Sequence, residues 1–310
     1  DRGAAFAGRD PSLGQLIMLF PIGRSVYNAL QVSLRGRLIK PLPFVRNADF
    51  QISYALSRFV GPSVNQDFTP VAVDYRAPLA FVGPNSMDRT HQLSVGGWFD
   101  LPYAFRLGLI SHVKTPLPVS LNLPTAGSPG EIFRTDFTGD GTTGDLLPGT
   151  KIGAFGRSVK LDQLGSAITN YNNTYAGKLT PAGQALVDAG LFTAQQLVAL
   201  GAVMPSLKLP PPDQVGIDSL ITTDLRLSWT YRPVKGRETF TIEPNVAVYN
   251  LFNIANYDPA GATLSGVLSG APGSVNGTPP GLRVNRITFG YGMYSFGGPR
   301  VFEWGLRIGF

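Results

Sequence analysis

The chain has 310 residues, with 26 Lys and Arg against 20 Asp and Glu, so its formal net charge is +6. Charged residues make up 15% of the chain, below the roughly 25% that is typical of soluble domains, and the apolar share of 43% is too high for a disordered chain. No run reaches the ~18 uninterrupted apolar residues of a membrane-spanning helix. The absence of cysteine excludes disulfides, thiolate metal sites and cysteine nucleophiles. Basic residues stand singly, which argues against a nucleic-acid partner.

Seven segments alternate between apolar and polar residues with a period of two, which predicts β-strands. They exceed the about 5–6 residues usual in soluble β-sandwiches and approach the about 9–11 residues of a transmembrane strand. In chain order they lie at residues 26–34, 50–57, 92–101, 105–114, 224–231, 240–248 and 302–310.

The two sides of these segments differ in a way that indicates the solvent on each side. The polar side carries Arg, Asp, Glu and Gln, which a water-filled lumen accepts and lipid does not. The apolar rows tend to end in aromatic residues, as in interfacial girdles: Tyr54, Phe99, Trp229, Tyr231 and Phe310. The pattern therefore predicts an all-β fold that is part of an antiparallel transmembrane β-barrel. The alternative is a large soluble β protein, whose apolar rows would pack on a second layer.

Short and long connections alternate along the chain, as in outer-membrane barrels with short periplasmic turns and long extracellular loops. The short connections are 101–103, 233–237 and the somewhat longer 39–47, and the long ones are 61–88, 116–219 and 251–299. This order predicts that the last strand runs inward and that Phe310 is periplasmic. Residues 286–296 also alternate and are interpreted as an extracellular β extension.

The connection at 116–219 is too long to be structureless in a compact protein. Residues 161–171 and 180–200 have helical spacing, with Thr180 as the N-cap, Pro181 as the first helical residue and a break at Gly190. We expect these helices to pack over the barrel mouth or against each other. The alternative is an amphipathic role at the membrane surface.

Several runs resemble one family. The run VYNLFNIANY at 248–257 resembles the NLFN…NY signature near the end of TonB-dependent outer-membrane receptors, and FEWGLRIGF at 302–310 resembles their terminal strand. YNALQVSL at 27–34 and DRTHQLS at 88–94 are similar to barrel strands of the Oar-like branch, which carries a carboxypeptidase-regulatory-like domain upstream. The resemblance covers most of residues 24–310 except the variable loops.

The resemblance implies a 22-stranded barrel in the outer membrane of a Gram-negative cell, an N-terminal plug, and energised uptake through the TonB system. This chain departs from that pattern, because seven or eight strands cannot make 22 and no plug or TonB box is visible. Asp1 also opens the chain without an initiator methionine or a leader. We therefore expect residues 1–310 to be the C-terminal part of a longer receptor, with residues 116–219 as an extracellular insertion and the plug outside this chain.

Charged residues on the polar side are candidates for the lumen wall. They can pair with the plug or line a solute path, or they can form salt bridges between neighbouring strands. The candidates are Arg35, Arg106, Asp224, Arg226, Glu243 and Arg307.

The apolar side of the final segment resembles the signal that the barrel-assembly machinery recognises. The residues concerned are Phe302, Trp304, Leu306, Ile308 and Phe310. An exposed strand edge with an aromatic end can be captured by strand addition. The alternative is a strand that simply ends in an interfacial aromatic residue.

One loop resembles a truncated calcium-binding loop. Asp136 and Asp140 occupy its first and fifth positions, Gly141 the sixth, and Asp145 follows, but Leu147 stands where a bidentate Glu belongs. The alternative is a set of Asx turns. No other cofactor is expected.

The two histidines, His91 and His112, are interpreted as strand or boundary residues rather than metal ligands or members of a triad. No Gly-x-Ser-x-Gly elbow or catalytic pair of carboxylates is visible, so no enzymatic activity is expected. The sequence thus predicts a receptor that takes up a scarce solute of unidentified class. The alternative is a structural or adhesive surface barrel without transport.

Overall fold

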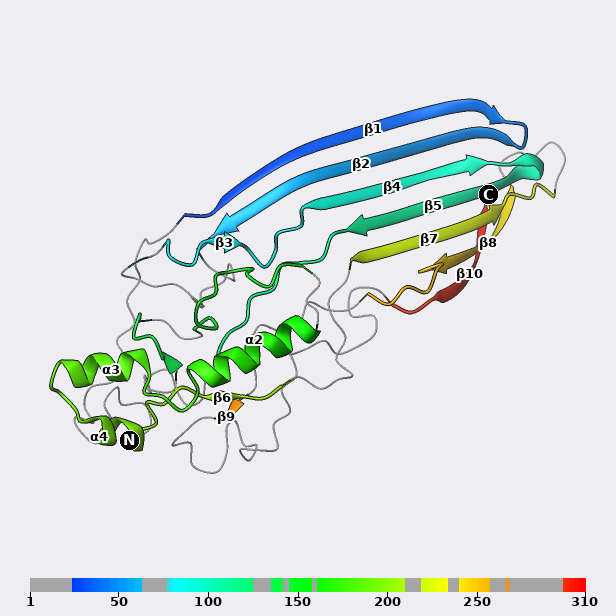
Figure 1. The fold of residues 1–310 in the computed structure, drawn as a ribbon. Helices are drawn as coiled ribbons and strands as arrows, with labels where there is room; N and C mark the ends of the chain where they lie inside the picture. Colours follow the sequence, from blue (N-terminus) through cyan, green and yellow to red (C-terminus); the bar gives the residue numbers. More distant parts are fainter. Residues whose placement is uncertain are drawn as a thin grey trace.

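The main body of the protein, in a computed structural model, is an antiparallel sheet of seven long strands (Figure 1). The structure describes residues 24–62, 77, 79–124, 135–141, 145–157, 161–209, 219–233, 240–256, 266–267 and 298–310. The long strands are β1 (Val26–Leu42), β2 (Val45–Gly61), β4 (His91–Asp100), β5 (Phe105–Lys114), β7 (Leu220–Trp229), β8 (Thr241–Tyr249) and β10 (Val301–Gly309). All seven predicted strands are thereby confirmed.

The strands follow one another through the sheet in the order β1-β2-β4-β5-β7-β8-β10, and each pairs with the next in antiparallel register. The short strand β3 (Gly83–Pro84) pairs with the end of β2, and β6 (Ser206–Leu207) pairs with β9 (Gly266–Val267) in a separate ribbon. Within the described residues the large sheet is open, with β1 and β10 as its two edges. The described strands therefore form an antiparallel meander, and the architecture is mainly β.

The first turn is tighter than the sequence indicated. Residues 39–47 were expected to form a connection of moderate length, but β1 and β2 run on through most of them and leave only Pro43 and Phe44 in the turn. The register shifts between Ile39 and Leu42, and Lys40 has a φ of 48°. A bulge of this kind lets two strands stay paired through a stretch without regular alternation. Periodicity alone therefore placed the turn in the right segment but made the connection too long.

Long connections leave one end of the sheet and short turns leave the other, as the alternation predicted. Tyr249 at the end of β8 is paired with Val301 at the start of β10, and Gly309 is paired with Thr241. Phe310 therefore lies at the short-turn end. The predicted β extension at 286–296 lies outside the described residues.

The pairing register brings the apolar rows of all seven strands onto one face of the sheet. Leu34 is opposite Ile52, which is opposite Val95, and the same face continues to β10. Large side chains on this face are open to solvent, with Trp304 81% exposed and Leu306 64% exposed. Of the described helices, none packs extensively against a long strand. The described helices therefore leave the apolar face uncovered.

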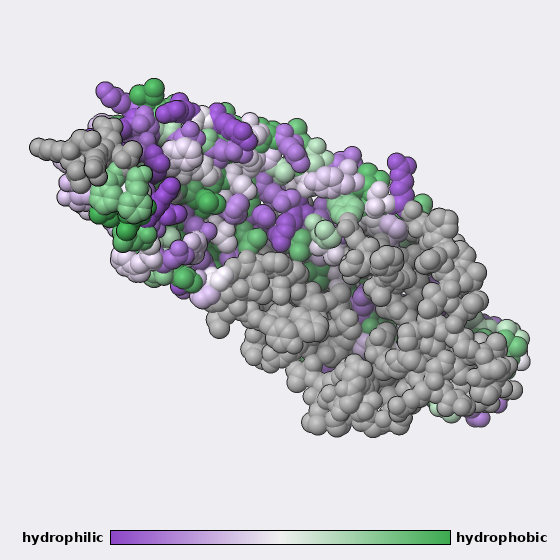
Figure 2. Space-filling model, turned by 180° about the vertical axis from the view of Figure 1, so that it is seen from behind, coloured by the Kyte–Doolittle hydropathy of each residue, from purple (hydrophilic) through white to green (hydrophobic). Residues whose placement is uncertain are grey.

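The opposite face carries most of the polar residues. Figure 2 shows hydrophilic side chains gathered over the middle of the part of the sheet that is visible from behind, with hydrophobic ones toward its margins. Arg35, Gln51 and Asp224 belong to this face, because they share the register rows that alternate with the apolar ones. The sheet is thus two-sided in the sense that the sequence predicted.

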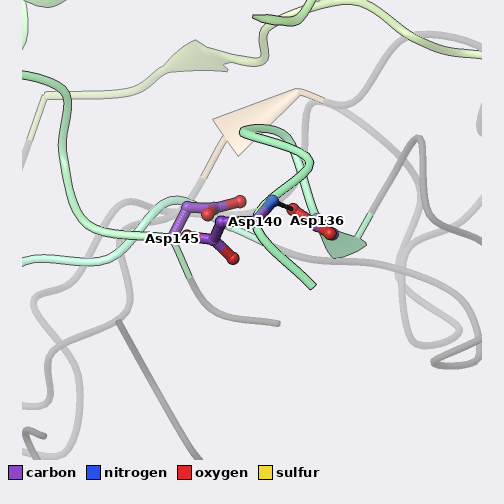
Figure 3. Close-up of side chains that lie close together, drawn as sticks. All are labelled: Asp136, Asp140 and Asp145. Atoms are coloured by element: carbon purple, nitrogen blue, oxygen red, sulfur yellow. Dashed lines mark hydrogen bonds between the residues drawn. The ribbon is translucent and has the colours of Figure 1, made fainter. Parts of the chain in front are cut away.

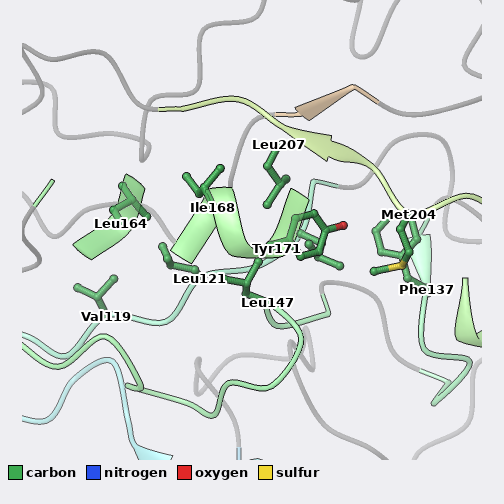
Figure 4. Close-up of a cluster of buried hydrophobic side chains, with 10 residues drawn as sticks. Val119, Leu121, Phe137, Leu147, Leu164, Ile168, Tyr171, Met204 and Leu207 are labelled. Atoms are coloured by element: carbon green, nitrogen blue, oxygen red, sulfur yellow. The ribbon is translucent and has the colours of Figure 1, made fainter. Parts of the chain in front are cut away.

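The connection between β5 and β7 contains a folded unit, which we call the lobe (described residues of 116–209). It contains α2 (Leu161–Thr174), α3 (Pro181–Asp188) and α4 (Ala194–Ala199). Figure 4 shows its core, which joins α2 to the segments around it. The buried members of this core are Val119, Leu121, Leu123, Phe137, Leu147, Leu164, Ile168, Tyr171, Met204 and Leu207.

The helix boundaries in the lobe follow local signals. Thr180 caps α3, because its side chain accepts a hydrogen bond from the backbone N–H of Gly183, and Pro181 is the first residue of the helix. A capping box between Thr193 and Gln196 starts α4. Between them Gly190 adopts a φ of 68°, which ends the first helix as predicted. Of the helices that the structure describes, none is both long enough and apolar enough to cross a membrane.

Candidate functional site

The polar face of the sheet contains a hollow of about 860 Å³. Three of the predicted lumen-facing residues, Arg35, Asp224 and Arg226, line it from β1 and β7. Its middle is floored by Gly96 and Gly108 on β4 and β5, where the absence of side chains leaves the sheet surface open. The hollow is therefore a product of glycine positions in the centre of the sheet and charged positions around them.

A second, smaller hollow of about 270 Å³ lies nearer the short-turn end and is lined by Arg106 and Glu243. The guanidinium Nε of Arg106 donates to the carboxylate of Asp100 at 2.7 Å, and its Cζ lies 6.0 Å from the ring centroid of Trp98. Glu243 is directly opposite Arg307 in the register of β8 and β10. Arg106 therefore forms a salt bridge between the neighbouring strands β5 and β4.

The residues around the larger hollow behave differently. The Asp224 carboxylate accepts a hydrogen bond from the backbone N–H of Asn250 at 2.8 Å, so it closes the end of β8. Within the described residues, Arg35 and Arg226 have no hydrogen-bond or ion-pair partner, and both side chains are exposed. The six predicted residues thus share one face of the sheet. Arg106 and Asp224 bind neighbouring groups, whereas Arg35 and Arg226 have no such partner among the described residues.

The apolar face has an aromatic border at its short-turn end. The Trp229 ring lies between Phe105, at 6.0 Å between centroids, and Tyr231, at 5.3 Å. The indole N–H of Trp229 donates to the carbonyl of Tyr103 at 3.1 Å. Trp and Tyr side chains of this kind suit an environment that is apolar on one side and wet on the other.

The five residues of the predicted assembly signal lie together on the apolar face of β10, which is an edge strand of the described sheet. Phe310 is 90% exposed, and its ring centroid lies 6.0 Å from that of Phe240, the residue before β8. The geometry agrees with both interpretations of this strand, an assembly signal and an interfacial aromatic end.

The three aspartates of the predicted calcium loop lie together inside the lobe (Figure 3). Asp136, Asp140 and Asp145 are 8%, 2% and 2% exposed, and one oxygen of each lies within 4.8 Å of the others. Gly141 has a φ of 88°, which allows the sharp turn that the sequence indicated at this position.

Backbone hydrogen bonds organise the same loop. Both carboxylate oxygens of Asp136 accept backbone N–H groups, including that of Gly141 at 2.9 Å. Asp145 accepts the backbone N–H of Phe137 at 2.6 Å and the hydroxyl of Thr138 at 2.7 Å. These bonds hold the loop together without an ion, so the calcium site stays a prediction.

Burial controls the protonation of this cluster. The pKa of Asp145 is raised from 3.8 to about 7, chiefly by desolvation and also by the charges of Asp140 and Asp136, against the opposing hydrogen bonds from Thr138 and Phe137. Desolvation also raises the pKa of Asp136. A protonated carboxyl or a bound cation would each relieve the repulsion between these groups.

The two histidines are strand residues, as predicted. His91 begins β4, where its ring stacks on Tyr54 and its Nδ1 lies 2.8 Å from the Tyr54 hydroxyl. His112 lies on the polar face of β5, with its Nδ1 2.9 Å from the Ser94 hydroxyl. Nothing in the sequence indicated these two pairs, since each joins residues of neighbouring strands.

Comparisons of the sequence with models of known protein families and with curated proteins found no match. The resemblance to TonB-dependent receptors therefore rests on the quoted motifs and stays a prediction.

Proposed function

We propose that this chain forms part of the wall of an outer-membrane β-barrel of the TonB-dependent receptor type, and that the complete protein takes up a scarce solute. The observation that carries the proposal is the uncovered apolar face, which continues across all seven long strands. In water such a face would be far larger than the apolar patch of a soluble monomer. Acyl chains are the solvent that suits it.

The direction of the strands indicates that a closed barrel would need additional strands. Seven strands in a meander leave β1 and β10 running in the same direction, so these two edges cannot pair with each other in antiparallel fashion. Bacterial barrels are antiparallel with an even number of strands. An odd number of additional strands, contributed by residues outside the described sheet, would close the wall and satisfy the backbone groups of both edges.

Transport is favoured by the polar face. A closed wall would place the hollow lined by Arg35 and Arg226 in a water-filled lumen, where guanidinium groups can meet the plug or a passing solute. By the same resemblance, the plug, the TonB system and the barrel-assembly machinery are the expected partners, and Phe310 lies on the periplasmic side.

A second function, adhesion or surface structure without transport, is favoured by the lobe. Its own hydrophobic core makes it a folded unit rather than a passive loop, and such a unit can present a surface to another molecule. The two functions make different demands on the energised inner membrane, because only uptake requires it.

The membrane assignment is tested by charge substitutions on opposite faces of β1. Leu34→Arg places a cation on the apolar face, which costs about 2–4 kcal/mol at the bilayer midplane, while Ser33→Arg places the same side chain on the polar face. We expect Leu34→Arg to lower the amount of assembled barrel in the outer membrane, measured by heat-modifiable migration, and Ser33→Arg to leave it unchanged. Equal behaviour of the two variants would contradict a lipid-facing apolar row.

Transport is tested by uptake of labelled iron complexes and oligosaccharides in cells with and without the intact gene. We expect uptake of one solute to depend on both the gene and the proton-motive force. Normal assembly of the barrel with unchanged uptake of every solute would favour the surface role.

A further inference from the structure

The lobe is attached to the sheet by few described contacts. Its core is internal, and its described helices do not pack extensively on the long strands. Figure 1 shows the lobe beyond the end of the sheet from which the long connections leave. Among the described residues, two sets of contacts join the lobe to other connections: the β6–β9 ribbon links it to residues 266–267, and a larger set links it to the neighbouring loop at 79–90.

The principal contact is a clasp made by Arg157 of the lobe. Its guanidinium donates to the backbone carbonyls of Asp88 at 2.5 Å and Pro116 at 2.6 Å, and it forms an ion pair with the Asp88 carboxylate. The side chain of Asp88 is 4% exposed, and its other oxygen accepts the backbone N–H of Phe59 in β2 at 2.7 Å. Asp88 thus links the end of the sheet to the lobe.

A small apolar contact lies beside the clasp. Phe81 packs against Leu146 and Ile152 of the lobe, and the backbone N–H of Ile152 donates to the carbonyl of Phe81 at 3.3 Å. The backbones approach so closely that a Cβ on Gly83 would lie 2.0 Å from the carbonyl oxygen of Ile152. This contact orients the docked lobe, but only a small cluster of apolar side chains forms it.

A second arginine, Arg89, lies near the clasp but has a different role. Arg89 donates to the carbonyl of Thr115 at 2.6 Å, and Thr115 continues the pairing of β5 with His91 of β4. Burial, and next the positive charge of Arg157, lower the pKa of Arg89. Arg89 therefore braces the sheet itself, whereas Arg157 holds the lobe.

We propose that the lobe is a preformed body with a docked and a released position, and that the Arg157–Asp88 clasp sets the balance between them. The attraction within a buried ion pair is offset by the cost of removing both charges from water, so the pair favours the docked position by only a small net free energy. Replacing one of its two residues can therefore reverse the preference for the docked position. On release the two groups regain water, while the core of the lobe stays closed. The lobe then moves away from the end of the sheet as one unit.

The test measures the position of the lobe in the intact protein by pulsed electron paramagnetic resonance. Spin labels are attached at Ser33→Cys in β1 and Thr169→Cys on the exposed side of α2, and no native cysteine within residues 1–310 competes for the label. We expect one narrow distance distribution in the parent protein. Arg157→Gln should lose most of that peak and gain a second, broader population.

Three further variants make the result decisive. Asp88→Asn keeps an oxygen for the Phe59 N–H but removes the charge, so it should release the lobe as Arg157→Gln does, and the double variant should release it no further. Arg89→Gln is the matched control and should leave the docked peak intact. An unchanged peak in Arg157→Gln, or equal release by Arg89→Gln, would overturn the proposal. Protease cleavage within α2 or α3 of Arg157→Gln would overturn it as well, since the lobe would then depend on the clasp for its fold.

Discussion

Two adjacent glycines of β4, Gly96 and Gly97, face opposite sides of the sheet and differ in the space available for a Cβ atom. A Cβ on Gly97 would lie 2.4 Å from the backbone oxygen of Asp49 and 3.0 Å from the Cα of Phe50. A Cβ on Gly96 would meet nothing closer than 3.9 Å. Gly97 is therefore required by the close approach of β2, whereas Gly96 only leaves the polar hollow open.

This difference predicts opposite outcomes for two identical substitutions. Gly97→Ala should destabilise the sheet by about 1–3 kcal/mol, because the backbone of β2 must shift to admit the methyl group. Gly96→Ala should change the unfolding free energy by less than about 0.5 kcal/mol. Urea unfolding of the assembled protein, followed by tryptophan fluorescence, measures both. A Gly96→Ala variant as unstable as Gly97→Ala would argue against the described register of β2 and β4.

The raised pKa of Asp145 predicts how the stability of the lobe depends on pH. Its pKa is about 7 in the folded protein against an ordinary value of 3.8, so between these values the folded state keeps a proton that the unfolded chain has lost. The stability that this carboxyl contributes is therefore present below about pH 4 and is lost as the pH rises to about 7, by on the order of a few kcal/mol. Thermal melts of the lobe at pH 5 and pH 8 should show the higher Tm at pH 5, and Asp145→Asn should flatten the difference.

The same melts test the calcium prediction. Calcium binds carboxylates without their protons, so millimolar Ca²⁺ should raise the Tm at pH 8 and have little effect at pH 5. Mg²⁺ at the same concentration is the matched control. A Tm at pH 8 that does not change with Ca²⁺ would leave the hydrogen bonds within the loop as the whole role of Asp136 and Asp145.

At the scale of elements, the lobe and the sheet depend on different cores. Leu121 is fully buried in the core of the lobe, whereas Leu191, between α3 and α4, is 60% exposed. Leu121→Ala should destabilise the lobe by about 2–5 kcal/mol and leave the sheet assembled. The readout is protease cleavage within residues 161–199 together with retained heat-modifiable migration. Leu191→Ala is the control, and loss of the sheet in Leu121→Ala would contradict two separate cores.

The final strand carries a prediction about assembly. Phe310 directly follows β10, is more exposed than the large apolar residues of that strand, and ends the apolar row at the short-turn end. Phe310→Ser should lower the yield of assembled barrel several-fold if the strand is an assembly signal. Val301→Ser, at the other end of β10 on the polar face, should not. Pulse-labelled folding in cells separates this effect from stability, since an interfacial anchor alone would alter the melting temperature and not the rate of assembly.

At the scale of the whole molecule, an open sheet with one apolar and one polar face lacks the closure that a membrane-spanning sheet needs. Both edge strands present unpaired backbone groups, which are costly in lipid. The lobe stands off one end of this sheet and is held there by contacts between loops. If the sheet spans a membrane as we propose, further strands must pair with both of its edges.

The amino-acid sequence by itself determined where the seven long strands run, which face of each is apolar, and where α3 begins and ends. These features follow from local causes: side chains alternate along a strand, and Thr180, Pro181 and Gly190 act on the backbone beside them. The first connection was predicted too long, because pairing with β2 carries β1 beyond the residues that alternate.

Only the tertiary structure decided the register, the hollow above Gly96 and Gly108, the core of the lobe and the clasp between Arg157 and Asp88. Each depends on residues from separate segments that meet in space, and 69 positions separate the two members of the clasp. A residue type shows whether a group can form an ion pair, but the path of the chain decides whether its partner is within reach.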